Sequence, residues 1–166
     1  MGSPEPIHVV LLDGSKVELH PMQPEDAAQL VKFHGTLSPD TTYLRYFSFH
    51  PELSEKELYR FTHVDHTDRE ALVAVVGDEI VGVARFDRQG DDEAEVAFVI
   101  ADAWQGRGLG PLLFQHLAAR AREVGVKRFV ADTLPRNRPM LKVFRRAGLP
   151  IEEHFVAGTI RVELTL

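Results

Sequence analysis

Hydrophobic and polar positions alternate in several short runs along the chain, which is the pattern of half-buried β-strands. Residues 7–12 and 16–20 form two extended runs on either side of Asp13-Gly14, a dipeptide that favours a tight hairpin turn. Six further extended runs are predicted at residues 70–76, 79–87, 93–100, 128–133, 151–156 and 159–164. Short turns that contain glycine join the first two and the last two of these runs into hairpins.

Helical spacing of apolar residues separates these strands. Predicted helices cover residues 24–37, 108–124 and 137–147, and another helix begins at Ser54. Pro24 is followed by two acids, which suits the first turn of a helix, and Ser54 with Glu57 forms a capping box. Gly125 follows the longest of these helices as a C-terminal cap. Residues 38–49 are rich in aromatic side chains and are predicted to be irregular.

The order of these elements is β-α-α-β-β-β-α-β-α-β-β when the first hairpin is counted once. Strands that interleave with helices in this manner predict an α/β (α+β) fold, in which one mixed sheet carries helices on its faces. A length of 166 residues suits one domain, so we expect residues 1–166 to form a single domain.

Composition narrows the class of protein. The chain is 44% hydrophobic and 27% charged, as is usual for a globular protein. It contains no cysteine, which excludes disulfides and thiolate chemistry. No run approaches the ~20 apolar residues of a membrane span, and no signal peptide precedes Ile7. We therefore predict a cytoplasmic protein.

The net charge of −6 results from 19 basic and 25 acidic residues. Binding to nucleic acid usually needs a basic surface, so this charge argues against such a partner. A cationic acceptor, such as an amine, is compatible with the charge. Solubility alone would also explain a modestly acidic surface, and the sequence leaves both explanations open.

The turn that follows the predicted strand 93–100 carries the strongest chemical signal. It contains Gly106, Gly108 and Gly110 and runs directly into a helix. Glycine lets the backbone approach a ligand and present consecutive N–H groups, and a helix N-terminus adds partial positive charge. The turn is therefore suited to binding an anion, and Arg107 can donate hydrogen bonds to a phosphate.

The spacing of these glycines discriminates between phosphate ligands. A nucleoside triphosphate loop requires Lys-Ser or Lys-Thr after its last glycine, and neither follows here. A dinucleotide loop requires Gly-x-Gly-x-x-Gly, whereas this turn has Gly-x-Gly-x-Gly. The motif that fits is Gln/Arg-x-x-Gly-x-Gly/Ala, which begins at Gln105. The alternative is a glycine-rich connection that binds no ligand.

This motif resembles the pyrophosphate loop of the GNAT superfamily of N-acetyltransferases. The resemblance covers nearly the whole chain and is most specific to the GNAT domain of bacterial Pat-type protein lysine acetyltransferases. The segments that carry it are Asp13-Gly14-Ser15, Tyr43-Leu44-Arg45-Tyr46-Phe47, Arg60 to Asp65, Ala94 to Phe98 and Gln105 to Gly108. It implies a GNAT fold, whose sheet is mixed and mostly antiparallel, with about six to seven strands and about four helices.

The resemblance also implies an activity. Acetyl-CoA is the expected co-substrate, and no metal is expected. The typical acceptor in the Pat type is the active-site lysine of an AMP-forming acyl-CoA synthetase, such as acetyl-CoA synthetase. In that family the GNAT domain is usually fused to a cyclic-nucleotide-binding or synthetase-like domain. The chain would then be the catalytic fragment of a larger protein.

Acylation of an amine needs a general base, because a lysine side chain near pH 7 is almost fully protonated. Glu93 and Glu95 point to the same face of their predicted strand, since side chains alternate along it. Glu95 lies further inside the strand, among apolar neighbours, and matches the position of the catalytic glutamate in the resembled family. We therefore predict that Glu95 is the base and that Glu93 is an exposed charge at the strand end. An exposed strand carboxylate or a structural ion pair is the alternative for Glu95.

The predicted acetyl-CoA site combines the end of this strand, the glycine-rich turn and the last predicted helix. Its residues are Phe98, Val99, Ile100, Gln105, Gly106, Arg107, Gly108, Leu109, Gly110, Asn137 and Phe144. The resemblance implies that a backbone N–H near Val99 polarises the thioester carbonyl. Asn137 would hydrogen-bond the pantetheine arm, cap its helix, or do both. Many GNAT enzymes place a proton-donating tyrosine seven residues after this asparagine, but Phe144 stands there and cannot donate a proton.

Tyr43, Arg45, Tyr46 and Phe47 lie between the first two predicted helices, where GNAT folds enclose the acceptor. We predict that they shape the acceptor channel, with core packing as the alternative. His63 and His66 lie near two aspartates, but a helix end and a solvated loop explain them better than a metal site does. Two other functions stay open: N-acetylation of a polyamine, aminoglycoside or amino acid, and sensing of acetyl-CoA without catalysis.

Overall fold

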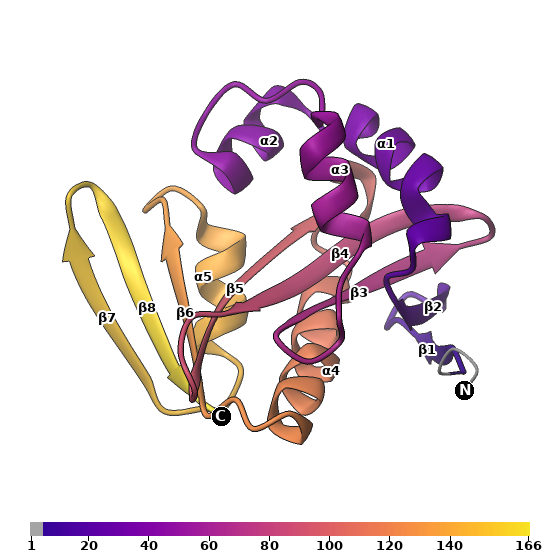
Figure 1. Ribbon diagram of the computed structural model, residues 1–166. Coiled ribbons are helices and arrows are strands. Elements are labelled where there is room, and N and C mark those ends of the chain that lie inside the picture. Colours follow the sequence, from indigo (N-terminus) through magenta and orange to yellow (C-terminus); the bar gives the residue numbers. More distant parts are fainter. Residues whose placement is uncertain (1–4) are drawn as a thin grey trace.

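The computed structural model describes residues 5–166, so the first four residues of the predicted domain lie outside it. Its centre is one eight-stranded sheet in the order β1-β2-β3-β4-β5-β6-β8-β7 (Figure 1). The strands are β1 (Ile7–Val10), β2 (Lys16–Pro21), β3 (Arg69–Val76), β4 (Glu79–Arg88), β5 (Glu93–Ile100), β6 (Arg128–Thr133), β7 (Ile151–Val156) and β8 (Thr159–Thr165). Neighbouring strands are antiparallel except β5 and β6, which run parallel. The predicted mixed, mostly antiparallel sheet is confirmed, with eight strands where about six to seven were expected.

The helices are α1 (Ala27–Thr36), α2 (Pro39–Tyr46), α3 (Glu55–Thr62), α4 (Leu109–Glu123) and α5 (Arg138–Arg145). Two 3-10 turns, η1 (Pro24–Asp26) and η2 (Asp102–Trp104), precede α1 and α4. In the part of the chain that the structure describes, no helix is long and apolar enough to cross a membrane.

Helix α2 corrects the prediction that residues 38–49 are irregular. The Ser38 side chain accepts a hydrogen bond from the Thr41 N–H at 3.1 Å, and Pro39 occupies the first helical position. Both features are signals for the start of a helix. The helix ends at Phe47, which adopts a left-handed conformation with φ 61°. The short helix lies against β5.

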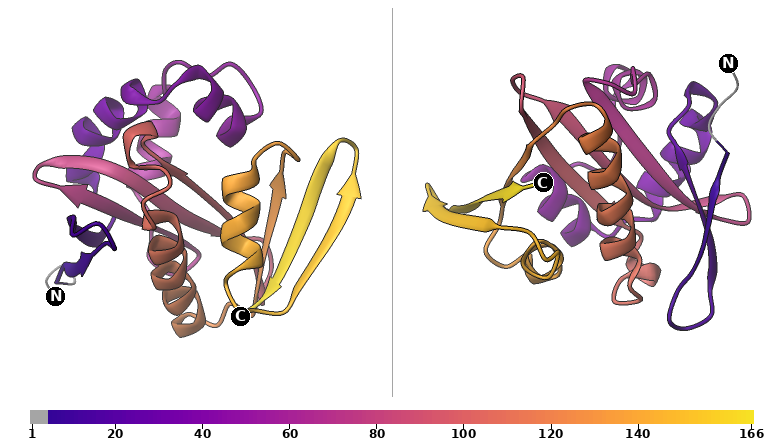
Figure 2. Two further views of the ribbon diagram at one scale, coloured as in Figure 1. Left: turned by 180° about the vertical axis from the view of Figure 1, so that it is seen from behind. Right: turned by 90° about the horizontal axis from the view of Figure 1, so that it is seen from below.

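The helices form two layers, one on each face of the sheet (Figures 1 and 2). Alternating residues of β3 enter two separate cores: Ala71 and Val73 share a cluster with Leu30 and Phe33 of α1. Their neighbours Leu72 and Ala74 share the other cluster with the buried leucines of α4 and with Phe144 of α5. The sheet is therefore buried on both faces, which explains why β3 and β4 read as nearly continuous apolar runs.

The sheet opens between its two parallel strands. Pairing of β5 with β6 is limited to residues 93–95 against 128–130, while β5 pairs with β4 along residues 94–100. Beyond Glu95, β5 therefore has no neighbouring strand on its β6 side. This separation, visible between β5 and β6 in Figure 1, leaves backbone groups of β5 available to a ligand.

Candidate functional site

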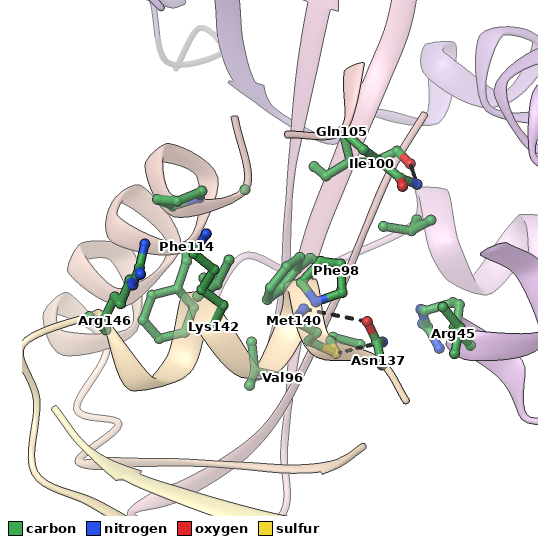
Figure 3. Close-up of a pocket in the computed structure, with 18 of the residues that line it drawn as sticks. Arg45, Val96, Phe98, Ile100, Gln105, Phe114, Asn137, Met140, Lys142 and Arg146 are labelled. Carbon is green, nitrogen blue, oxygen red and sulfur yellow. Dashed lines mark hydrogen bonds between the residues drawn. The ribbon is translucent and has the colours of Figure 1, made fainter. Parts of the chain in front are cut away.

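A groove of about 1260 Å³ follows this opening. It is lined by β5, by the loop between η2 and α4, and by side chains of α2, α4 and α5 (Figure 3). Pockets for drug-sized ligands usually measure roughly 300–1,000 Å³, so the groove suits a larger or longer molecule. The elements that meet here are those in which the sequence predicted the site.

The glycine-rich loop forms one wall of the groove. Gly106 and Gly108 have φ values of 73° and 87°, a left-handed conformation that glycine adopts without strain. The Gln105 side-chain amide donates a hydrogen bond to the Ile100 carbonyl at 3.0 Å, which ties the loop to the end of β5. Helix α4 begins directly afterwards at Leu109, and its first N–H groups have no partner within the helix. This end of the groove is therefore suited to binding an anion.

Arg107 points to a different partner than the one predicted. Its Nε donates a hydrogen bond to the Asp13 carboxylate at 2.8 Å, and a second guanidinium N–H donates to the Ser15 hydroxyl at 2.7 Å. The guanidinium also lies 3.9 Å from the ring centroid of Trp104. Arg107 does not line the groove, and its side chain attaches the loop to the β1–β2 turn. In this structure the Arg107 side chain thus holds the loop in place.

The pKa of Asp13 is lowered from 3.8 to about 2, first by the Ser15 N–H and hydroxyl and then by Arg107. A lowered pKa means that the pairing is present above the ordinary pKa and is lost as the pH falls towards 2. The attachment of the loop to the β1–β2 turn is therefore complete throughout the neutral range.

Removing this attachment tests its role. Arg107→Ala is expected to change the fluorescence emission of Trp104, the single tryptophan of the chain, because the guanidinium leaves its ring. We expect the affinity for CoA to fall by up to roughly tenfold, since one exposed ion pair and one cation–π contact are lost. Arg145→Ala is the matched control, because Arg145 pairs with Glu153 away from the loop. Unchanged emission and affinity in Arg107→Ala would contradict the role.

The backbone of β5 supplies hydrogen-bond donors to the groove. The N–H of Ala101 donates to the Val81 carbonyl, and the N–H of Gln89 donates to the Glu93 carbonyl. In an antiparallel ladder, every second residue of a strand is hydrogen-bonded to the neighbouring strand. Counted back from Ala101 towards Glu93, these bonded residues include Val99, whose N–H therefore points to β4. The N–H groups of Phe98 and Ile100 therefore face the opening. The donor expected near Val99 is one of these two neighbours.

Glu95 lines the groove where the pairing of β5 with β6 stops. Its side chain is exposed and not enclosed by the apolar neighbours that the sequence suggested. It lies directly across from Asp87 of β4, whose carboxylate is 3.5 Å from Arg60. Glu93, predicted to be a free charge at the strand end, is instead half-buried and paired with Arg128 at 2.7 Å. Glu95 is thus the glutamate of β5 that reaches the groove.

Asn137 and Phe144 differ in their relation to the groove. The Asn137 side chain accepts a hydrogen bond from the Met140 N–H at 3.4 Å, which confirms that it caps α5, and it also lines the groove (Figure 3). Phe144 is fully buried and makes edge-to-face contacts, with centroids 5.7 Å away, to Phe98 and Phe114. Those two rings line the groove, so Phe144 supports its wall from behind. Leu109 is likewise buried in the core and contributes no side chain to the groove.

Of the residues predicted to contact the acceptor, some line the groove and one lies outside it. Arg45 and Phe47 line the groove, whereas Tyr43 lies beside Arg136, outside it. Tyr46, which the sequence placed in the same segment, also lines the groove, and burial raises the pKa of its hydroxyl.

Basic side chains gather along the groove despite the net charge of −6. Arg122, Lys142 and Arg146 extend from α4 and α5, and Figure 3 shows Lys142 and Arg146 at the end of the groove opposite Arg45. These residues were not predicted, because their spacing fits an ordinary solvated helix face equally well. Local positive charge favours a polyanionic ligand.

On the edge hairpin of β7 and β8, the side chains of Glu152, His154 and Glu163 have potential metal-ligand atoms within 4.8 Å of one another. These three residues do not line the groove.

Comparison with known proteins agrees with this geometry. The family model of the acetyltransferase (GNAT) domain matches residues 16–150. The chain is 35% identical over 147 residues to Acetyltransferase Pat of Mycolicibacterium smegmatis, covering 86% of this chain and 44% of that protein. The solved GNAT domain of S. lividans PAT superposes with a TM-score of 0.92 at 42% identity, covering 97% of both chains.

A cAMP-binding acyltransferase from Mycobacterium smegmatis superposes with a TM-score of 0.68 at 30% identity, covering 97% of this chain and 47% of that one. The chain therefore spans less than half the length of these two mycobacterial proteins. The family match covers most of the described sheet together with the glycine-rich loop. The chain thus belongs to the GNAT family of acetyltransferases and is similar to the GNAT domains of bacterial Pat proteins.

Proposed function

We propose that this acetyltransferase transfers the acetyl group of acetyl-CoA directly to the side-chain amine of a protein lysine, with Glu95 as the general base. The observation that carries the proposal is the position of Glu95. It is the carboxylate of β5 that enters the groove, at the point where β5 loses its pairing with β6. A base at this position has access both to an acceptor arriving from the α2 side and to the unpaired backbone of β5.

The groove fits acetyl-CoA, the donor that GNAT acetyltransferases use. The N–H groups of the glycine-rich loop and of the start of α4 would hold the pyrophosphate, because helix N-termini bind anions. Backbone groups of Phe98 and Ile100 would pair with the amides of the pantetheine arm. Arg122, Lys142 and Arg146 would neutralise the remaining phosphate charge. Bound acetyl-CoA supplies an activated thioester.

The residues of the chain would then act in sequence. Glu95 accepts a proton from the lysine ammonium, directly or through a water, which frees the nitrogen lone pair for attack on the thioester carbonyl. The N–H of Phe98 or Ile100 stabilises the negative charge that develops on the carbonyl oxygen. Phe144 carries no proton and is buried behind the groove, so the sulfur departs as a thiolate when the C–S bond breaks. The amide nitrogen then loses its remaining extra proton, which passes through water to the thiolate, and Glu95 returns its own proton to solvent. Glu95 therefore carries the acid–base chemistry of the side chains.

Similarity to Pat proteins supports the choice of acceptor. We propose an AMP-forming acyl-CoA synthetase as the protein substrate, in the cytoplasm, and no nucleic-acid partner. The lengths of the two mycobacterial relatives, one of which is named for cAMP binding, support a further proposal. Residues 1–166 would be the single catalytic domain of a larger protein, in which a fused domain controls the activity.

Incubation with labelled acetyl-CoA and purified acetyl-CoA synthetase tests the acceptor. We expect label on the protein at its active-site lysine, identified by mass spectrometry, with loss of synthetase activity. A synthetase with that lysine replaced by arginine is the control and should stay unlabelled. Label on a polyamine, aminoglycoside or amino acid with none on any protein would overturn the proposal in favour of a small-molecule acetyltransferase. Calorimetric binding of acetyl-CoA without turnover on any amine would favour a sensor.

A further inference from the structure

The arginines of the described residues fall into two groups according to their partners. Most arginines outside the groove pair with a carboxylate. The other arginines outside the groove, Arg69 and Arg85, donate hydrogen bonds to backbone carbonyls. The arginines that line the groove are Arg45, Arg122, Arg138 and Arg146. Within residues 5–166, none of these four has a carboxylate within 4.0 Å. Their charges are thus available to a ligand.

Arg45 stands apart from the other three. Arg122 lies in the last turn of α4, Arg138 is the first residue of α5, and Arg146 is the C-cap of α5. Arg45 belongs to α2, and Figure 3 shows it at the opposite end of the groove from Arg146. In the proposed function the acceptor enters on the α2 side of Glu95, so the group that Arg45 would meet belongs to the acceptor.

The surroundings of Arg45 hold it in place without neutralising it. Its guanidinium lies 4.7 Å from the ring centroid of Tyr46, and that ring stacks on His50 at 4.3 Å. His50 is fixed in turn by Glu57 at 2.9 Å. A guanidinium on an ordered aromatic platform is oriented before a ligand arrives, which lowers the entropic cost of binding.

A second cation lies behind this platform. Arg85 stacks on Phe61 at 4.2 Å and donates to the Phe61 carbonyl at 3.4 Å. Burial, followed by the nearby charge of Arg45, lowers the pKa of Arg85 to about 10, a value at which it is still protonated near pH 7. Two like charges close together repel each other, so an anion bound by Arg45 would relieve a cost that the structure already contains.

We infer that Arg45 binds a carboxylate next to the acceptor amine, so that the preferred acceptor lysine is flanked by aspartate or glutamate. This rests on the proposed function. A guanidinium binds a carboxylate in a two-point geometry, and a basic residue beside the lysine would be repelled by Arg45 and Arg85. The same chemistry is offered by the α-carboxylate of a free amino acid, and the experiment separates the two sources.

Blocked peptides with a single lysine flanked on both sides by Glu, Gln or Lys provide the measurement. For the wild type we expect kcat/KM to be roughly tenfold higher with Glu than with Gln, the size of one charge-assisted hydrogen bond, and lowest with Lys. Arg45→Gln should bring the Glu/Gln ratio close to one, and Arg45→Glu should favour the Lys-flanked peptide. Lys56→Ala removes a positive charge from exposed α3 without touching the groove, so it should keep the wild-type ratio.

The outcomes separate the two proposals. Equal rates on the three peptides, or ratios that Arg45→Glu does not change, overturn the role of Arg45 and leave lysine acetylation standing. If intact proteins alone are acetylated, mapped sites give the same comparison: acidic flanking residues should be enriched for the wild type and not for Arg45→Glu. If free amino acids alone are acetylated, protein lysine acetylation is overturned. In that case the rates on an amino acid and on its amide are compared. A preference for the amino acid that disappears in Arg45→Gln would support carboxylate binding by Arg45. A preference that persists in Arg45→Gln would refute carboxylate binding by Arg45.

Discussion

Replacing Glu95 by glutamine is expected to lower the turnover number by roughly 10²–10⁴-fold while acetyl-CoA binds with nearly unchanged affinity. Glutamine keeps the size of the side chain and its capacity for hydrogen bonding, but it cannot accept the proton of the lysine ammonium. The groove offers no second carboxylate on β5, because Glu93 is paired with Arg128 away from the opening. The loss should therefore appear in kcat, not in the binding of the donor.

Steady-state kinetics on an acetylated protein or peptide, together with calorimetric titration of acetyl-CoA, separate these two quantities. Glu93→Gln is the matched control, since it makes the same chemical change two residues earlier on the same face of the strand. Its effect should be confined to a small loss of stability from the exposed Arg128 pair. Turnover near the wild-type value in Glu95→Gln would exclude Glu95 as the base.

Phe144→Ala is expected to lower the free energy of unfolding by about 3–5 kcal/mol. The Phe144 ring is 0% exposed and sits between Phe98 of β5 and Phe114 of α4, with edge-to-face contacts to both. Truncation would leave a cavity at the junction of α4, α5 and the sheet, where packing from three elements prevents complete collapse. Because Phe98 and Phe114 line the groove, a weaker affinity for acetyl-CoA should accompany the loss of stability.

Urea denaturation followed by circular dichroism measures the change in unfolding free energy. Phe155→Ala is the control: it removes the same ring from the edge strand β7, where the side chain is 72% exposed, and its effect should stay within about 0.5 kcal/mol. Comparable losses in the two variants would mean that Phe144 is not the packing centre that the structure indicates.

Much of the fold follows from patterns that extend over a few residues. Alternating or nearly continuous apolar runs identified the strands. The capping box at Ser54 identified α3, where the Ser54 hydroxyl accepts the Glu57 N–H at 3.1 Å. The failure was α2, whose residues lack a clear apolar stripe, so that only Ser38-Pro39 signalled a helix. The many aromatic residues of this segment favoured an irregular structure in the sequence analysis, and the two-residue signal for a helix start was not enough to predict α2.

The candidate site was predicted as a segment more accurately than as a set of side chains. Glycine spacing placed the loop correctly, because left-handed φ values at Gly106 and Gly108 are a local requirement of the turn. The directions of Arg107, Leu109 and Phe144 were not predictable, because a sequence position does not say whether a side chain turns towards a ligand, a core or a distant turn.

The sequence by itself determined the strands, the start of α4 and the glutamate of β5, because alternation, capping and backbone freedom act between residues close together in the chain. The tertiary structure alone decided the contacts across the chain. Arg107 meets Asp13 across 94 positions, and buried Glu70 meets Arg120 across 50. It also decided that β5 loses its pairing with β6 beyond Glu95. Such contacts depend on how separate elements pack, so the groove that they create exists only once the chain has folded.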